Sequence, residues 1–133
     1  MPDGLALNLR GGPFDTVKVV NSLVKRGLLQ ISSNAFQILR CTVEDCTVEG
    51  NGSLSIRSTG TGLDVVDVTN NEVGGRLQVS TFDKDDVVRV NGNTVGKDLL
   101  LFGGDGTDKL DQGGVTPNDV TGKTVENSFE GTP

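Results

Sequence analysis

The 133-residue sequence contains no histidine, tryptophan or tyrosine, and only two cysteines. Without histidine, the chain lacks the side chain that most often serves as a general base near neutral pH. A cysteine nucleophile would have no imidazole partner, and two thiols alone make a poor zinc-ligand set. The composition therefore favours a non-catalytic protein, and leaves an enzyme that uses other acid–base groups as an alternative.

Positive charge and stacking surfaces are also scarce. The net charge is −6, with 12 basic against 18 acidic residues, and the aromatic residues are five phenylalanines. A nucleic-acid backbone or an anionic membrane surface needs a basic patch, and unpaired bases need aromatic platforms. No apolar run approaches the ~20 residues of a membrane-spanning helix. The sequence thus predicts neither a nucleic-acid partner nor a membrane partner.

The main positive feature is a repeat with a spacing in the low twenties of residues. VDVTNNEVGGRLQV at 66–79 returns as VRVNGNTVGKDLLL at 88–101. Each unit has an anchor valine, a second core-type residue two positions earlier, a valine five positions later, and then an apolar-x-apolar pair. The anchors are Val19, Val43, Val68, Val90 and, less regularly, Val120. Equal residue types at equal offsets favour coils that stack directly on one another over a meander.

The later apolar positions follow the same spacing. The valines five residues after the anchors are Val24, Val48, Val73, Val95 and Val125. The apolar pairs are Leu29/Ile31, Leu54/Ile56, Leu77/Val79 and Leu99/Leu101. Because the alternation has period two and Gly or Asn interrupts every few residues, the pattern predicts short strands and no helix.

Three short strands per unit resemble the right-handed parallel β-helix family seen in polysaccharide lyases, adhesins and other large extracellular proteins. The resemblance implies an all-β, right-handed parallel β-helix (solenoid) of about five coils. We expect an N-terminal cap or leading strand at 1–13, regular coils at 14–101 and an irregular C-terminal coil at 102–133. Asn71 and Asn93 would stack as an asparagine ladder inside a corner. Uncovered strand edges at either end would allow end-to-end self-association.

One segment departs from the repeat. GGDGTDKLD, at 103–111, matches G-G-x-G-x-D-x-apolar-x, the calcium nonapeptide of RTX-type β-rolls. The resemblance implies Asp105, Asp108 and Asp111 as candidate calcium ligands. Calcium takes six to eight oxygen ligands, and in that family two successive turns share each ion. The following QGGVTPND breaks the pattern, so a polar glycine-rich loop without an ion is the alternative.

The two cysteines are five residues apart. Cys41 falls at a strand-core position, and Cys46 falls at the corner occupied elsewhere by Asn or Ser. Two small buried residues are one interpretation. A disulfide across the corner, suited to an oxidising compartment, is the other.

Outward strand positions form columns along the expected solenoid. One column contains Lys18, Thr42, Asp67 and Arg89, and another contains Gln30, Ser55, Gln78 and Leu100. We interpret the first as a solvated face with Asp67 beside Arg89; a catalytic row is the alternative. Flat threonine faces bind ice in some β-helices, and the threonines that share one offset here are Thr47, Thr94 and Thr124. Leu23 and Glu72 interrupt that column.

The sequence therefore favours a non-catalytic structural or adhesive module. The β-helix resemblance implies that it belongs to a larger secreted or cell-surface protein and contacts a polysaccharide or protein surface. A calcium-stabilised RTX-like module and a polysaccharide-active lyase or epimerase are the alternatives. No catalytic or cofactor-binding residue is assigned.

Overall fold

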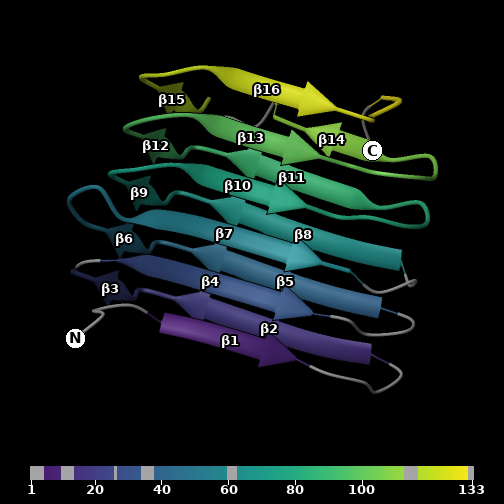
Figure 1. The fold of residues 1–133 in the computed structure, drawn as a ribbon, viewed down its shortest axis with the longest axis horizontal. Helices are drawn as coiled ribbons and strands as arrows, with labels where there is room; N and C mark the ends of the chain where they lie inside the picture. The colour runs from purple at the N-terminus through teal and green to yellow at the C-terminus, as the bar shows by residue number, and fades with distance from the viewer. Residues whose placement is uncertain are drawn as a thin grey trace.

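The computed structural model describes residues 5–9, 14–25, 27–33, 38–59, 63–112 and 117–131. All the regular secondary structure in these ranges is β-strand, and the strands form three parallel sheets (Figure 1). None of the described segments forms a helix long and apolar enough to cross a membrane. The predicted all-β parallel solenoid is confirmed.

Each sheet is a stack of strands from successive coils. In spatial order, sheet A contains β1 (Leu5–Leu9), β4 (Leu28–Ser33), β7 (Ser53–Ser58), β10 (Leu77–Ser80), β13 (Leu99–Phe102) and β16 (Thr124–Asn127). Sheet B contains β2 (Phe14–Val20), β5 (Ile38–Glu44), β8 (Leu63–Thr69), β11 (Val87–Asn91) and β14 (Lys109–Asp111). Sheet C contains β3 (Leu23–Val24), β6 (Thr47–Val48), β9 (Glu72–Val73), β12 (Thr94–Val95) and β15 (Asp119–Val120).

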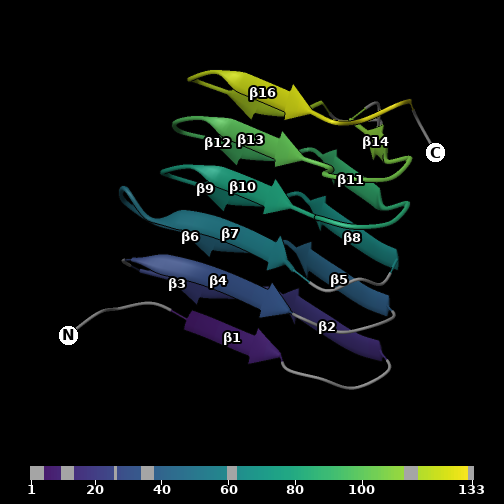
Figure 2. The ribbon, with the colours of Figure 1, turned by 45° about the vertical axis from the view of Figure 1, so that its right-hand side comes forward.

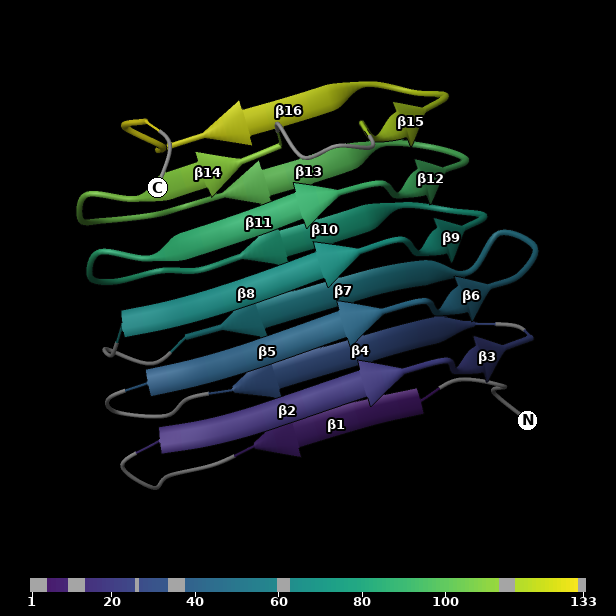
Figure 3. The same cartoon turned by 180° about the vertical axis from the view of Figure 1, so that it is seen from behind.

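The chain visits sheets B, C and A in turn, and each visit lies one strand further along the stack. Figure 2, turned by 45°, and Figure 3, seen from behind, show this climb, with β1 and β16 at opposite ends. Strand β1 precedes the first full set and pairs with β4, while residues 1–4 and 10–13 of the expected N-terminal segment lie outside the described residues.

End strands such as β2 and β14 pair on one side within the described chain. The predicted end-to-end association stays a prediction.

The register follows the first four anchors of the repeat. Val19 pairs with Val43, Val43 with Val68, and Val68 with Val90. The apolar pairs of sheet A stack in the same way, so that Leu29, Leu54, Leu77 and Leu99 form one column. The predicted stacking of equivalent residues is confirmed for these four units.

The fifth anchor was wrong. Val120 pairs with Val95 in sheet C, and Val125 pairs with Leu100 in sheet A. The place beside Val88 in sheet B is taken by Leu110 instead. The reason lies in the sequence: Leu110, Asp111 and Gln112 stand where the preceding coil has Val88, Arg89 and Val90, so the anchor valine is missing.

The core is a set of inward aliphatic columns between the three sheets. Its residues alternate with half-buried or exposed ones along strands such as β7, β8 and β11. Valine, leucine and isoleucine dominate, and two cysteines join them. The fully buried aliphatic side chains include Leu29, Ile31, Leu54, Ile56, Leu77, Leu99, Leu101, Val43, Val48, Val66 and Val68.

Truncation in the middle of a column should be costly. Leu54 is 0% exposed and lies between Leu29 and Leu77. We expect Leu54→Ala to lower the free energy of unfolding by about 2–5 kcal/mol, through lost burial and an unfilled cavity. Urea denaturation measures this value. The outward neighbour Ser55 provides the control, and Ser55→Ala should change the value by less than about 0.5 kcal/mol. Equal losses in the two variants would contradict the inward placement of Leu54.

The corner between sheets B and C is built by two consecutive residues. The first has a left-handed backbone, with positive φ at Asn21, Asp45, Asn70 and Gly92. The second points its side chain inward, and this ladder contains Ser22, Cys46, Asn71, Asn93 and Asn118. Asn71 Oδ1 accepts the Cys46 amide at 2.9 Å, and Asn71 Nδ2 donates to Val43 O and Asn93 Oδ1 at 2.9 and 3.0 Å. The predicted asparagine ladder is confirmed.

Candidate functional site

The RTX-like segment forms the corner between sheets A and B in the last coil. Its glycines allow the chain to approach the preceding coil closely. A Cβ atom on Gly104 or Gly106 would lie 2.1 Å from Phe82 O or Lys84 O, and both glycines have positive φ. The Asp105 amide donates to Phe82 O at 2.6 Å. Coil stacking therefore accounts for these glycines without an ion.

The three candidate calcium ligands lie in different environments. Asp105 is exposed, Asp111 is half-buried at the end of β14, and Asp108 is 0% exposed. Asp108 Oδ1 accepts the Asp86 amide at 2.9 Å. Within the described ranges, no group of three or more His, Cys, Asp or Glu side chains is placed to hold a metal ion. Calcium binding by these three residues stays a prediction.

Asp108 belongs instead to a column of acidic residues, one from each of four successive coils. We call Asp64, Asp86, Asp108 and Glu130 the acid ladder; neighbouring members are 22 residues apart. Asp86 Oδ1 accepts the Asp64 amide at 2.7 Å, and Glu130 Oε2 accepts the Asp108 amide at 2.7 Å. Each acid beyond the first therefore caps a backbone donor of the preceding coil.

The acid ladder places carboxyl groups away from water. Asp86 and Asp108 are 0% exposed, and the Oδ2 atom of each is buried without a hydrogen-bond partner. Burial raises the pKa of Asp86 to about 7; Asp64 and Asp108 add to the rise, while the Asp64 amide and the Thr81 hydroxyl oppose it. Burial also raises the pKa of Asp108, against the opposing hydrogen bond from the Asp86 amide.

Sequence reasoning missed this ladder, although a signal for it exists. Asp64, Asp86 and Asp108 each stand two residues before the first inward aliphatic residue of a sheet B strand, Val66, Val88 or Leu110. An acidic residue at a fixed offset beside core positions, repeated at the coil spacing, marks an inward column. The match of 103–111 to the RTX-type nonapeptide instead assigned Asp108 to a candidate calcium motif.

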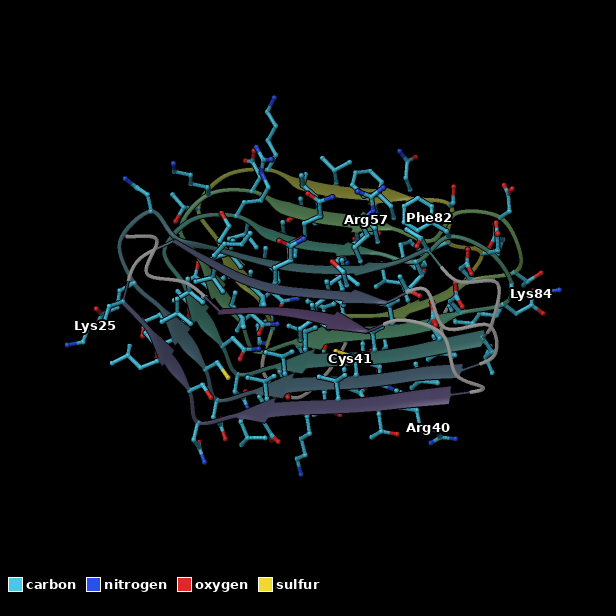
Figure 4. All side chains as sticks on the ribbon, turned by 60° about the horizontal axis from the view of Figure 1, so that its bottom comes forward. Lys25, Arg40, Cys41, Arg57, Phe82 and Lys84 are labelled. Carbon is cyan, nitrogen blue, oxygen red and sulfur yellow. The ribbon has the colours of Figure 1, made fainter. Side chains whose placement is uncertain are left out.

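Both cysteines are free and buried. The Cys46 thiol donates to Glu44 O at 3.3 Å and Val19 O at 3.5 Å. Burial raises the pKa of Cys41 to about 12, with Asp64 and Asp67 adding to the rise. Figure 4 shows Cys41 between the sheets and its neighbour Arg40 pointing outward. Of the two interpretations, the one that treats both cysteines as small buried residues is confirmed. The raised pKa of Cys41 makes its thiol a poor nucleophile.

The outward column of sheet B is in register as predicted. Its members are Lys18, Thr42, Asp67 and Arg89, and Asp111 continues it. Arg89 Nη1 lies 3.5 Å from Asp67 Oδ1, with the two side chains 40% and 35% exposed. A solvated pair of this kind contributes about 0–1 kcal/mol. It fits a polar outer face.

The outward face of sheet A carries ordered polar side chains. Its central column contains Gln30, Ser55, Gln78 and Leu100. Gln30 donates to Ser32 Oγ at 3.2 Å and Gln78 to Ser80 Oγ at 3.3 Å, so the amides are held in place. The Arg57 guanidinium lies 5.4 Å from the centroid of the Phe82 ring, and Figure 4 shows the two together outside the sheet.

The outward positions of sheet C do not form a threonine face. The register places Leu23, Thr47, Glu72, Thr94 and Asp119 in one column. Thr124 lies in sheet A, beside Leu99. The regular threonine array that an ice-binding face requires is absent from this column.

Comparisons with known proteins add no relative to this description. No protein-family model, no curated protein and no solved structure matches the chain. The chain is a parallel β-solenoid repeat protein on the grounds of its own strand pairing.

Proposed function

We propose that this chain is a non-catalytic structural or adhesive β-helix module of a secreted or cell-surface protein. The observation that carries the proposal is the difference between the buried polar side chains and the outward ones. The buried polar groups, such as Asn71 and Asp86, bond the backbone of a neighbouring coil. The outer columns carry ordered or solvated polar side chains. This arrangement suits a rigid spacer with a contact face.

Sheet A is the face best suited to contact. Its outward positions carry two glutamine amides, a serine hydroxyl and the Arg57 guanidinium, on strands that lie about 4.8 Å apart. Gln78 and Arg57 are each held by a neighbour, Ser80 and Phe82 respectively, so binding immobilises them at low entropic cost. Such donors and acceptors match the hydroxyl groups of a polysaccharide, and we name this class of partner.

A glycan array probed with the labelled full chain tests the proposal. We expect binding to at least one polysaccharide, and no unsaturated product when the chain is incubated with uronate polymers. Arg57→Ala and Gln78→Ala should each weaken binding about tenfold, which corresponds to about 1.4 kcal/mol. Thr42→Ala, on the outer face of sheet B, is the matched control and should leave binding unchanged.

Two outcomes would overturn the proposal. Unsaturated or epimerised product would show that the chain is a polysaccharide-active enzyme. Binding lost in Thr42→Ala and retained in the sheet A variants would assign the contact face to sheet B.

A further inference from the structure

The inward columns of sheet A change from aliphatic to polar in the last coil. Leu99 pairs with Thr124, and Leu101 pairs with Glu126. The two leucines are 0% exposed, whereas Thr124 and Glu126 are exposed. Strand β16 therefore presents polar side chains at the positions that earlier coils fill with buried aliphatic ones.

The anchor column of sheet B ends in the same way. The register of β11 and β14 places Gln112, a half-buried residue, in line with the buried Val90. The columns that end on Leu110 and Val120 stay aliphatic, and both residues pack against the core. The last coil thus packs on the coil before it, while part of its inner surface is polar.

Hydrogen bonds join these polar side chains across the end of the core. Gln112 Nε2 donates to Glu126 Oε1, which links sheet B to sheet A. Asn118 Nδ2, at the corner between sheets B and C, donates to Gln112 Oε1 at 3.4 Å and to Val90 O at 2.7 Å. We call Gln112, Asn118 and Glu126 the polar brace, because their side chains connect the sheets at this end.

The outer edge of sheet B at this end is covered by the chain itself. Strand β14 has β11 as its strand neighbour on one side. On the other side, the Leu110 amide donates to Gly131 O at 2.8 Å. The Glu130 amide donates to Asp108 O at 2.8 Å. Residues 130–131 therefore occupy the place beside β14 that a further strand would take, and Figure 3 shows the chain after β16 turning back toward β14.

A second copy stacked on this end would meet the polar brace. Its first full coil has Val19 in the anchor column, and its Leu7 lies in register with Ile31. Continuing the internal register would set Val19 against Gln112 and Leu7 against Glu126. A carboxylate and an amide would then lose water beneath an aliphatic coil, and burying such groups without new partners costs free energy.

We propose that the polar brace and residues 130–131 form a stop cap: the C-terminal end of the solenoid rejects another coil, so that a second copy of this chain can extend the sheets only at the N-terminal end. Polar terminal repeats keep solenoids soluble, and covered edges prevent strand pairing between molecules. The stop cap narrows the expected end-to-end association to pairs. It uses inward positions, and so does not depend on the contact face proposed for sheet A.

The test restores the aliphatic columns with Gln112→Val and Glu126→Leu in one chain. Removing two polar groups from the contact should raise the association constant about a hundredfold or more, and yield species larger than pairs. Sedimentation velocity over a wide range of protein concentration measures this change. The matched control is Asp111→Val with Asn127→Leu, which removes one acid and one amide from outward positions of the same coil. This control should sediment as wild type does.

Hydrogen exchange shows which end makes the new contact. Inward residues of sheet A donate their amides to the following coil, as Leu77 does to Asp98 O and Leu99 to Lys123 O. The Thr124 amide is next in this series and faces the end of the stack. It should gain about tenfold or more protection in the double variant as the protein concentration rises, and none in wild type. If the double variant does not fold, Glu126→Leu alone decides the question in both assays.

Any of three results would overturn the stop cap. One is a wild-type chain that forms species larger than pairs and protects Thr124 in them. Another is a folded restored-column variant that associates no more strongly than wild type. The last is equal association of the restored-column variant and the outward control, since the inward positions would then have no special effect.

Discussion

Asn71→Leu should unfold the solenoid or lower its free energy of unfolding by about 3 kcal/mol or more. The change removes three bonds that the Asn71 side chain makes, to Cys46 N, Val43 O and Asn93 Oδ1. Asn93 Oδ1 keeps its bond from the Asn71 backbone amide. The Cys46 amide loses its acceptor and Val43 O loses a donor in a buried site, and each unpaired buried group costs about 1–3 kcal/mol. Leucine has the same number and branching of side-chain heavy atoms as asparagine, so the variant keeps the branched side chain and removes its polar atoms. Circular dichroism during urea denaturation measures the change.

Asn70 is the matched control, because it precedes Asn71 in the same corner but is exposed with φ 55. Glycine adopts that backbone without strain, so Asn70→Gly should change stability by only a few tenths of a kcal/mol. If Asn71→Leu is as mild as Asn70→Gly, the ladder does not hold the corner, and the coils are joined mainly by their aliphatic columns.

The fold could be predicted because stacking forces equivalent residues into columns. Val43, Val68 and Val90 recur at one place in each coil since a slipped strand would turn its apolar side chains outward. The same logic found the asparagine corner at Asn71 and Asn93. Local strand preferences alone would have predicted short strands, but not which strands pair with one another.

The last coil could not be predicted in the same way. Its sheet B strand contains Leu110, and Gln112 follows where the earlier coils have the anchor valine, so the valine pattern aligned Val120 with Val90. The true alignment depends on Asn118, whose side chain accepts the Asn93 amide at 3.1 Å. An anchor based on asparagine would have placed this coil correctly.

The acid ladder escaped sequence reasoning because buried carboxyls run against the usual burial preference. An aspartate beside a valine is ordinarily assigned to the surface. Asp86 is buried because its carboxyl caps the Asp64 amide in a corner, and that need becomes visible only when the coils are stacked. The glycines of 103–111 fit two interpretations, since close coil contact and calcium turns favour the same residue.

Deleting one whole coil tests the stacking account most directly. Val65 aligns with Val87, and Val66 with Val88, so removing residues 66–87 joins Val65 to Val88 without changing the register. The deletion also rejoins both ladders, because Cys46 then meets Asn93 and Asp64 meets Asp108. In a solenoid, stability is a sum over coils and their interfaces. The shortened chain should therefore fold, with lower stability.

The decisive measurement is the far-UV circular dichroism and cooperative urea unfolding of this variant beside a deletion of residues 66–76. The shorter deletion joins the middle of a sheet B strand to a sheet A strand and breaks every column. We predict β-sheet signal and a cooperative transition for the whole-coil deletion, and loss of both for the partial one. Loss of folding in both variants, or equal folding in both, would contradict a solenoid built from interchangeable coils.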